Sequence, residues 1–416
     1  MEKSAQLIYA ASMRLHLALD EGSLKEAKAA IAQGARVEVI DSSGETSWHR
    51  AFNNGCFHIA RFLVSLGTAD VNLKDDDGCT ALHLACRGGQ IGIVRSFVKD
   101  GLVDVNARNN GGETALFCAC SHGGLKLVQY LIEQCGADAN IKDSQGKTAL
   151  ICAIPSGKLL RVEIVRCLVE QGFADVHAQS NEGETALLTA TIYGHLEVVR
   201  YLVEKCGANV NVKDKFGETA LMYSVHRGRL ELMRYLIEQG SVDVNAKCNI
   251  GDTALIIAAR SGLVEFVRYL VYHCGADANI KNGQGYSALS VCMPEDDLRI
   301  VRDLVERGHA DVNAQCNSGE TALHMACFHG HQEVVRYLVE QCGADANIRD
   351  RAGITALHKA SAHGDLKVVQ LLVEQGGADC SFGNGIHGST ALHAAAVRQY
   401  RQHAPVMLYL VEHWVI

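Results

Sequence analysis

The sequence predicts an all-α solenoid of about twelve stacked helix–turn–helix units. A Thr-Ala-Leu phrase occurs ten times between Thr80 and Leu392, mostly 34 residues apart, with Ser287 replacing Thr once. Most copies are followed by apolar residues at helical spacing and then by a glycine. A fixed period of this length is typical of units that bury their apolar faces only against their neighbours.

The unit around Thr185 shows what each repeat should contain. Residues 181–183 predict a turn whose Gly takes a positive φ. The hydroxyl of Thr185 is placed to cap a first helix, and Gly194 is placed to end that helix in a left-handed conformation. A second helix is expected over about residues 196–205, with Gly207 ending it.

This unit resembles the ankyrin repeat, whose family pattern is Thr-Pro-Leu-His-x-Ala, then Gly-His, a Val-Val-x-x-Leu-Leu helix and Gly-Ala-Asp-Val-Asn. The resemblance covers almost the whole chain and implies an ankyrin-repeat solenoid with hairpin-like turns. Ala stands at the family's Pro position almost throughout, in keeping with a total of three prolines. The predicted units begin near Ala11, Asp41, Asp75, Asn109, Asp143, Ser180, Asp214, Cys248, Asn282, Cys316, Asp350 and Asn384.

We predict that residues 1–416 form a single ankyrin repeat domain. Residues 1–40 are expected to be a degenerate N-terminal capping repeat, because a stack needs a polar outer unit. Residues 41–383 contain ten regular repeats, and 384–416 form a C-terminal repeat with an insertion. The last segment, around Trp414, has exposed apolar groups and no polar cap, so that end either packs on something or continues into a longer chain.

Two repeats, 143–179 and 282–315, depart from the pattern. Pro155 lies near the end of the first helix in one, with extra residues 158–160, and Met293–Asp297 replaces the glycine turn in the other. Because Pro removes a helix donor, the first helix should end early in both. The change is either tolerated turn variation or a kink or loop that contacts a partner.

Composition narrows the possible partners. A net charge of −8 argues against a phosphate-binding surface, so we expect no nucleic acid partner. No apolar run is long enough to cross a bilayer, so we expect no membrane partner. Four of the sixteen cysteines share one register on alternate units, too far apart to pair, and no CxxC pair exists. We therefore expect a reducing, cytoplasmic location.

No catalytic or cofactor motif is present, so we expect no enzyme activity, no cofactor and no metal site. His324, Cys327 and His331 lie close in sequence, but the family pattern gives His324 a hydrogen bond within its repeat and buries Cys327. Acidic residues precede many capping threonines, where the helix dipole favours them. If they form a ridge along the groove, they would favour a basic peptide.

In the ankyrin family the usual binding face is concave, built from the turn tips and the exposed positions of the first helix. The matching positions form an apolar and aromatic stripe with a few cations, the residue types enriched at binding hot spots. These partner-binding candidates are Ile192, Tyr193, Phe216, Tyr223, Arg227, Ile250, Ile257, Arg260, Tyr286, Met325, Phe328 and His329. The alternative is that some of them point inward and pack between units.

The sequence predicts a non-catalytic scaffold that binds a partner protein or peptide along this groove. The alternative is the target-recognition arm of a larger protein, such as a ubiquitin ligase adaptor, a channel or a host-directed effector. One further possibility comes from the resemblance, since the family's turn asparagine can be hydroxylated by an oxygenase. The matching residues are Asn72, Asn106, Asn140, Asn211, Asn245, Asn279, Asn313 and Asn347, and the simpler interpretation is a hydrogen-bonded turn Asn.

Overall fold

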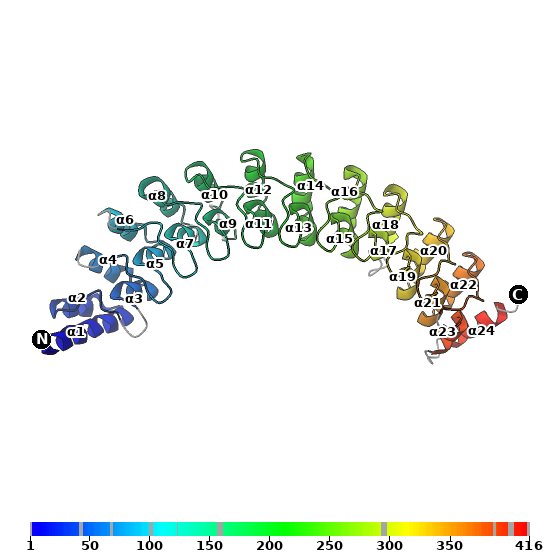
Figure 1. Ribbon diagram of the computed structural model, residues 1–416, viewed down its shortest axis with the longest axis horizontal. Helices are drawn as coiled ribbons and strands as arrows, with labels where there is room; N and C mark the ends of the chain where they lie inside the picture. The colour runs from blue at the N-terminus through cyan, green and yellow to red at the C-terminus, as the bar shows by residue number, and fades with distance from the viewer. Residues whose placement is uncertain are drawn as a thin grey trace. The chain divides into compact units, whose positions relative to one another are not determined.

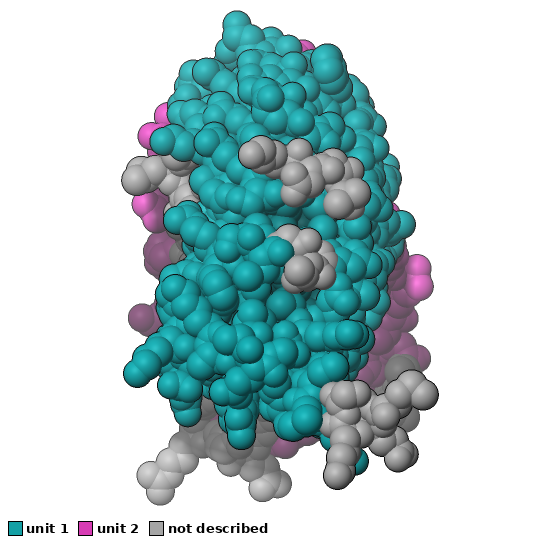
Figure 2. Space-filling view, turned by 90° about the vertical axis from the view of Figure 1, so that its left-hand side faces the viewer, with its two compact units in different colours: residues 1–209 teal, residues 210–416 magenta. Residues whose placement is uncertain are grey.

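The computed structural model describes residues 2–40, 45–66, 70–99, 103–122, 124–155, 161–292, 298–385, 388–397 and 403–413. These residues contain twelve helix pairs and no strand, with one isolated bridge between Lys74 and Thr80. The predicted all-α repeat fold is therefore confirmed. The chain divides into two compact units, Met1–Asn209 and Val210–Ile416, which Figure 2 distinguishes by colour.

In unit 1 the first helices of the repeats form one row and the second helices form another (Figure 1). The first helices are α1 (Glu2–Asp20), α3 (Ser47–Asn53), α5 (Ala81–Arg87), α7 (Ala115–His122), α9 (Ala149–Ala153) and α11 (Ala186–Tyr193). The second helices are α2 (Leu24–Ala32), α4 (Phe57–Ser65), α6 (Ile91–Lys99), α8 (Leu125–Cys135), α10 (Arg161–Glu170) and α12 (Leu196–Glu204).

Unit 2 repeats the two-row arrangement. Its first helices are α13 (Ala220–His226), α15 (Ala254–Arg260), α17 (Ala288–Val291), α19 (Ala322–His329), α21 (Ala356–His363) and α23 (Ala391–Val397). Its second helices are α14 (Leu230–Glu238), α16 (Val264–Cys274), α18 (Leu298–Arg302), α20 (Gln332–Glu340), α22 (Leu366–Glu374) and α24 (Ala404–His413), with α18 continuing as a π-helical segment, Asp303–Arg307.

The local expectations for the unit around Thr185 are confirmed. The hydroxyl of Thr185 accepts a hydrogen bond of 3.2 Å from the backbone N–H of Leu188, which is one of the orphan donors at a helix start. Gly194 follows α11 with a φ of 75°, and Gly183 in the turn has a φ of 78°. The second helix, α12, ends at Glu204, one residue before the predicted end.

Backbone hydrogen bonds join the turn of each repeat to the turn of the next. In unit 1 the N–H of Asn110 donates to the carbonyl of Asp77 at 2.9 Å, and in unit 2 that of Asn249 donates to the carbonyl of Phe216 at 2.9 Å. The turn asparagines add a second set of bonds between repeats. The side-chain oxygen of Asn72 accepts from the N–H of Asp104 at 3.1 Å, and that of Asn313 accepts from Asp345 at 2.9 Å.

All eight asparagines of this register make the corresponding bond, so the predicted hydrogen-bonded turn is confirmed for the whole set. The bond satisfies a backbone donor in the next repeat and fixes its register.

The second helices are cross-linked by arginine and tyrosine. The guanidinium of Arg302 lies 5.3 Å from the ring centre of Tyr337 in the next repeat, and the Tyr337 hydroxyl donates to Glu306 at 3.0 Å. Arginine also pairs with glutamate inside one second helix, as between Arg336 and Glu333 at 3.1 Å. These arginines of the second helices are therefore part of the scaffold.

The first helices are shortened at the two irregular repeats, as predicted. In unit 1, α9 has 5 residues and is followed closely by Pro155. In unit 2, α17 has 4 residues, whereas its neighbours α15 and α19 have 7 and 8. The segments 158–160 and 293–297, on which part of the prediction fell, lie outside the described residues, as do residues 414–416.

Candidate functional site

In each unit the turn tips and the exposed sides of the first helices form a face, hereafter the first-helix face of that unit, and the predicted residues are divided between the two units. Two of these residues, Ile192 and Tyr193, belong to unit 1 and lie at the end of α11. The other ten belong to unit 2. Phe216, Ile250 and Tyr286 lie on turns before α13, α15 and α17, and the rest lie on or directly after the first helices, at Tyr223, Arg227, Ile257, Arg260, Met325, Phe328 and His329.

Several of these side chains are exposed to a degree that is unusual for apolar groups. The exposed fraction is 65% for Ile250, 58% for Phe216, 52% for Phe328 and 48% for Tyr193. Arg227 and His329 are exposed as well, and Met325 is half-buried. Phe216, Ile250 and Phe328 all belong to unit 2, and exposed apolar groups gathered on the face of one unit are typical of a contact surface.

The expected exposure of Ile257 is wrong, since this side chain is only 3% exposed. It occupies the same register as Tyr223 and Met325, four residues after the capping Thr, and both of those are half-buried. Ile is short and branched at Cβ, so its whole side chain lies against the helix, whereas Tyr and Met reach past their neighbours to the surface. Ile257 belongs to the core.

Two of the candidates are held by carboxylates of their own repeat. The guanidinium of Arg260 binds Asp252 with distances of 2.6 and 3.1 Å, and Asp252 also accepts from the amide of Asn282 at 2.8 Å. The hydroxyl of Tyr223 donates to Asp214 at 2.6 Å. These contacts orient both side chains on the face and occupy both carboxylates, and the charge of Asp252 is balanced by Arg260.

The candidates in unit 2 gather around a hollow of about 600 Å³ above the short helix α17, hereafter the α17 hollow. Five of the twelve predicted residues line it, namely Ile250, Arg260, Tyr286, Met325 and His329, together with Asn282, Gly283, Gln284, Ser290 and Val291. Arg260, at the end of α15, and His329, at the end of α19, line the hollow together with Ser290 and Val291 of α17. A hollow of this size matches the volume range of small binding sites.

Unit 1 has a corresponding hollow of about 630 Å³ beside its own short helix α9, and both Ile192 and Tyr193 line it. Its walls are more polar, with Glu113, Asp143 and Glu184 among them. Lys147 lies 3.4 Å from Glu184. Both hollows therefore lie beside a short first helix but present different chemistry.

A second hollow in unit 2, of about 330 Å³, was missed by the sequence analysis. We name it the α21 hollow, and its walls are Phe328, Ile354, His358, Lys359, Ala362, His363, Asn384, Ser389, Thr390, His393, Ala394 and Val397. Phe328 forms its edge with the ammonium of Lys359 above the ring, 5.5 Å from the ring centre. Of these residues only Phe328 was predicted.

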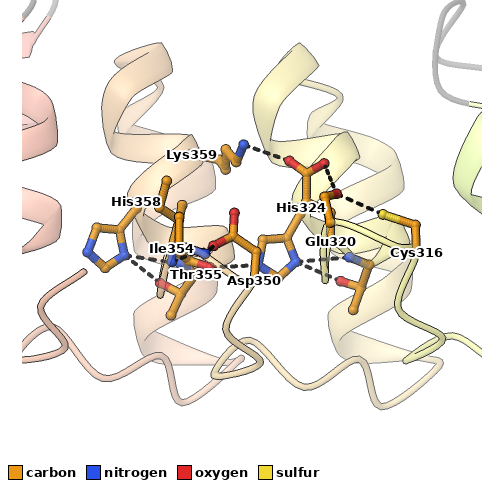
Figure 3. A network of polar contacts seen from close by, with 11 residues as sticks. Cys316, Glu320, His324, Asp350, Ile354, Thr355, His358 and Lys359 are labelled. Atoms are coloured by element: carbon orange, nitrogen blue, oxygen red, sulfur yellow. Dashed lines mark hydrogen bonds and ion pairs between the residues drawn. The ribbon is translucent and has the colours of Figure 1, made fainter. Parts of the chain in front are cut away.

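Glu320 and Lys359 show why that hollow was difficult to predict. They are 39 positions apart in sequence, yet the Lys359 ammonium donates to the Glu320 carboxylate at 2.7 Å (Figure 3). The hydroxyl of Ser318 donates to the same carboxylate at 2.9 Å. The bond crosses between neighbouring repeats, and only the stacking of the repeats brings the two side chains together.

The histidine that follows the capping Thr also links repeats. The N–H of Thr321 donates to Nδ1 of His324 at 3.2 Å, and Nε2 of His324 lies 3.1 Å from the carbonyl oxygen of Ile354 in the next repeat (Figure 3). Because Nδ1 accepts, the neutral ring carries its hydrogen on Nε2, which donates. Burial lowers the pKa of His324 and so favours this neutral form.

The cysteines near these hollows are structural. Cys327 is fully buried, as expected, and burial raises the pKa of its thiol. Burial likewise raises the pKa of Cys152, beside the unit 1 hollow, to about 11. Across the described ranges, no three His, Cys, Asp or Glu side chains come together in a way that could hold a metal ion.

A bilayer-spanning segment is also missing from the described part of the chain, where every helix is too short or too polar to cross a membrane.

Family models of ankyrin repeats match most of the chain. The model described as ankyrin repeats (3 copies) matches residues 66–143, 123–214 and 206–282, the model described as ankyrin repeats (many copies) matches 289–339 and 323–373, and the single ankyrin repeat model matches 43–76. No curated protein matches the chain. Ankyrin repeats are generally protein–protein interaction modules, and proteins built from them are typically non-catalytic interaction scaffolds. The repeat-by-repeat matches and the twelve helix pairs agree that this chain belongs to the ankyrin repeat family.

Proposed function

We propose that the chain is a non-catalytic scaffold that binds a partner protein or peptide on the first-helix face of unit 2, with the α17 hollow as the central contact. The observation that carries this proposal is that five predicted binding residues converge on one hollow. Ile250, Tyr286 and Met325 provide an apolar wall, and Arg260 and His329 provide donors at its rim. Buried aromatic and arginine contacts of this kind supply most of the energy in protein interfaces.

A cytoplasmic location fits this function. All sixteen cysteines are free thiols, and most are buried inside the repeats as small apolar groups. Stable disulfides form in oxidising compartments, so a chain with this many unpaired thiols suits a reducing one.

The target-recognition arm of a larger assembly is the second candidate function. It is favoured by α24, where Leu408 and Val411 are 67% and 49% exposed. Apolar groups at this exposure on an outer helix are suited to packing against another chain or a further domain. Analytical ultracentrifugation of the full chain, with and without Leu408→Ser and Val411→Ser together, tests for self-association through this helix. A monomer with the same sedimentation coefficient in both forms removes the support for packing between copies.

The scaffold proposal is tested by crosslinking mass spectrometry of the full chain in a cell extract. The triple variant Ile250→Ala, Met325→Ala and Phe328→Ala should lose the partner crosslinks formed by the wild type. The matched triple variant Leu7→Ala, Tyr9→Ala and Leu17→Ala removes three exposed apolar groups from α1, with exposed fractions of 70%, 56% and 60%, and should keep them. Equal crosslinking by wild type and the first triple variant, with both folded by circular dichroism, would disprove the proposal.

A further inference from the structure

We infer that the first-helix face of unit 2 takes one extended, acidic segment of a partner protein, which places a bulky apolar side chain in each of the two hollows. This inference rests on the proposed function and adds the chemistry and spacing of the ligand.

We infer the negative charge of the segment from the carboxylates of this face, which are already hydrogen-bonded within the protein. Asp214 accepts from the hydroxyl of Tyr223 at 2.6 Å, and Glu218 lies 3.1 Å from Nε2 of His226. Asp252 is 1% exposed and is bound by Arg260. The carboxylates of this face therefore have partners within the protein and offer little to a basic ligand.

Glu320 completes this set, because Lys359 donates to it (Figure 3). Ser318 donates to the same carboxylate. The Glu320 side chain is 16% exposed. The sequence-based expectation of an acidic ridge that favours a basic peptide therefore has no support in unit 2.

Two arginines and one histidine of the same face keep unused donors. Arg227 is exposed at the end of α13. Arg260 gives Nη1 and Nη2 hydrogens to Asp252, but a guanidinium has five N–H donors, and 43% of this side chain remains exposed. His329 adds a further donor at the rim of the α17 hollow. An incoming carboxylate therefore finds donors, and complementary charge of this kind steers association and fixes register.

The two hollows set the spacing of the apolar side chains. The walls of the α17 hollow include Ile250, Tyr286 and Met325, and those of the α21 hollow include Phe328, Ala394 and Val397. Their central helices, α17 and α21, are two repeats apart, and stacked helices lie about 10 Å from one another, so the hollows are about 20 Å apart. An extended chain advances about 3.3 Å per residue, so the two side chains should be about six residues apart.

The experiment uses the full chain as bait for a phage-displayed library of random 16-residue peptides. We expect the selected peptides to carry a net negative charge and two bulky apolar residues five to seven positions apart. Selection of basic peptides, of peptides with one apolar residue, or of no peptide would overturn the inference.

Point variants then locate the selected peptides, with affinities measured by fluorescence anisotropy. Ile250→Glu at the α17 hollow and Val397→Glu at the α21 hollow place a repelling charge on side chains that are 65% and 81% exposed, so the fold should be kept. Each should weaken binding at least tenfold, and Leu17→Glu on α1, which is 60% exposed, should not. A loss with Ile250→Glu only would overturn the two-hollow inference and leave the proposed function standing, whereas no loss with either would count against both.

Discussion

The guanidinium of Arg260 donates two hydrogen bonds, of 2.6 and 3.1 Å, to the buried carboxylate of Asp252. Arg260 lies at the end of α15, and Asp252 lies just before the start of the same helix. The pair spans the whole first helix of its repeat and borders the α17 hollow. It therefore has a structural role as well as a place on the proposed binding face.

Removing that arginine should cost stability. Arg260→Ala leaves Asp252, which is 1% exposed, with a weakened set of donors, and breaking a buried ion pair from one side typically costs several kcal/mol. Because the Arg260 side chain is itself 43% exposed, we expect a smaller loss in the free energy of unfolding, of about 2 kcal/mol. The measurement is urea denaturation. Arg227→Ala, at an exposed site, should change the value by less than about 0.5 kcal/mol, and equal effects would contradict this role for the pair.

Stability should fall as the solution is acidified below about pH 6.5, the ordinary pKa of histidine. Burial lowers the pKa of His83, His324 and His358 in the folded state, so the unfolded chain binds more protons once the pH drops below that value. The contribution is complete above the unfolded pKa and is lost progressively as pH falls from there toward the lower folded values.

The check on this acid sensitivity is the melting temperature measured between pH 7.5 and pH 5. His324→Ile copies Ile256, which occupies the same register in another repeat, and should reduce the pH dependence while lowering stability at neutral pH. His393→Ile, at an exposed position, should change the pH dependence less. A pH profile that is the same for wild type and His324→Ile would contradict the assignment.

Gly330, which ends α19, should be far less replaceable than Gly343, although both have positive φ, at 77° and 67°. A Cβ on Gly330 would overlap the ring of His363 in the next repeat, whereas a Cβ on Gly343 meets nothing within 4 Å. Gly343→Ala should cost about 1 kcal/mol for the left-handed backbone alone. Gly330→Ala should cost at least twice that, measured by thermal denaturation, and equal losses would show that the ring moves aside freely.

Phe173→Gly should stabilise the protein. Phe173 is 81% exposed with a φ of 49°, and it occupies the position that Gly377 holds with a φ of 60° in another repeat. Relief of the left-handed strain should exceed the entropy that Gly adds to the unfolded chain, for a net gain of about 0.5 kcal/mol. Urea denaturation should show a higher midpoint for Phe173→Gly and a lower one for Ile250→Gly, a site that is 65% exposed and has no positive φ. A lower midpoint for Phe173→Gly would show that its side chain contributes packing.

The sequence was sufficient for features that depend on local chemistry. The cap at Thr185, the left-handed Gly194 and the early end of α9 before Pro155 are set by residues within a few positions of one another. The hydrogen bond of His324 to its own Thr was likewise readable from the repeat pattern. The domain boundaries and the assignment of the binding residues stay predictions.

Features that depend on side-chain length and on stacking could not be predicted in this way. Ile257 and Met325 have the same register, but one is buried and the other half-buried because only Met reaches past the neighbouring helices. The α21 hollow depends on Lys359, whose partner Glu320 belongs to the preceding repeat. The period and register predict where the Cβ of a side chain lies. Its exposure and its contacts depend on its length and on the residues of the adjoining repeats.

The hydrogen bonds that join each turn to the next have a mechanical consequence. Because the contacts of a repeat are made with its immediate neighbours, tension applied along a unit can peel one repeat away without loosening those further along. A repeat of 34 residues that detaches and straightens releases about 110 Å of slack, at about 3.3 Å per residue. Such a chain lengthens in discrete steps under load. When a bound partner pulls on it, one repeat can unfold while the repeats that remain stacked keep their contacts with that partner.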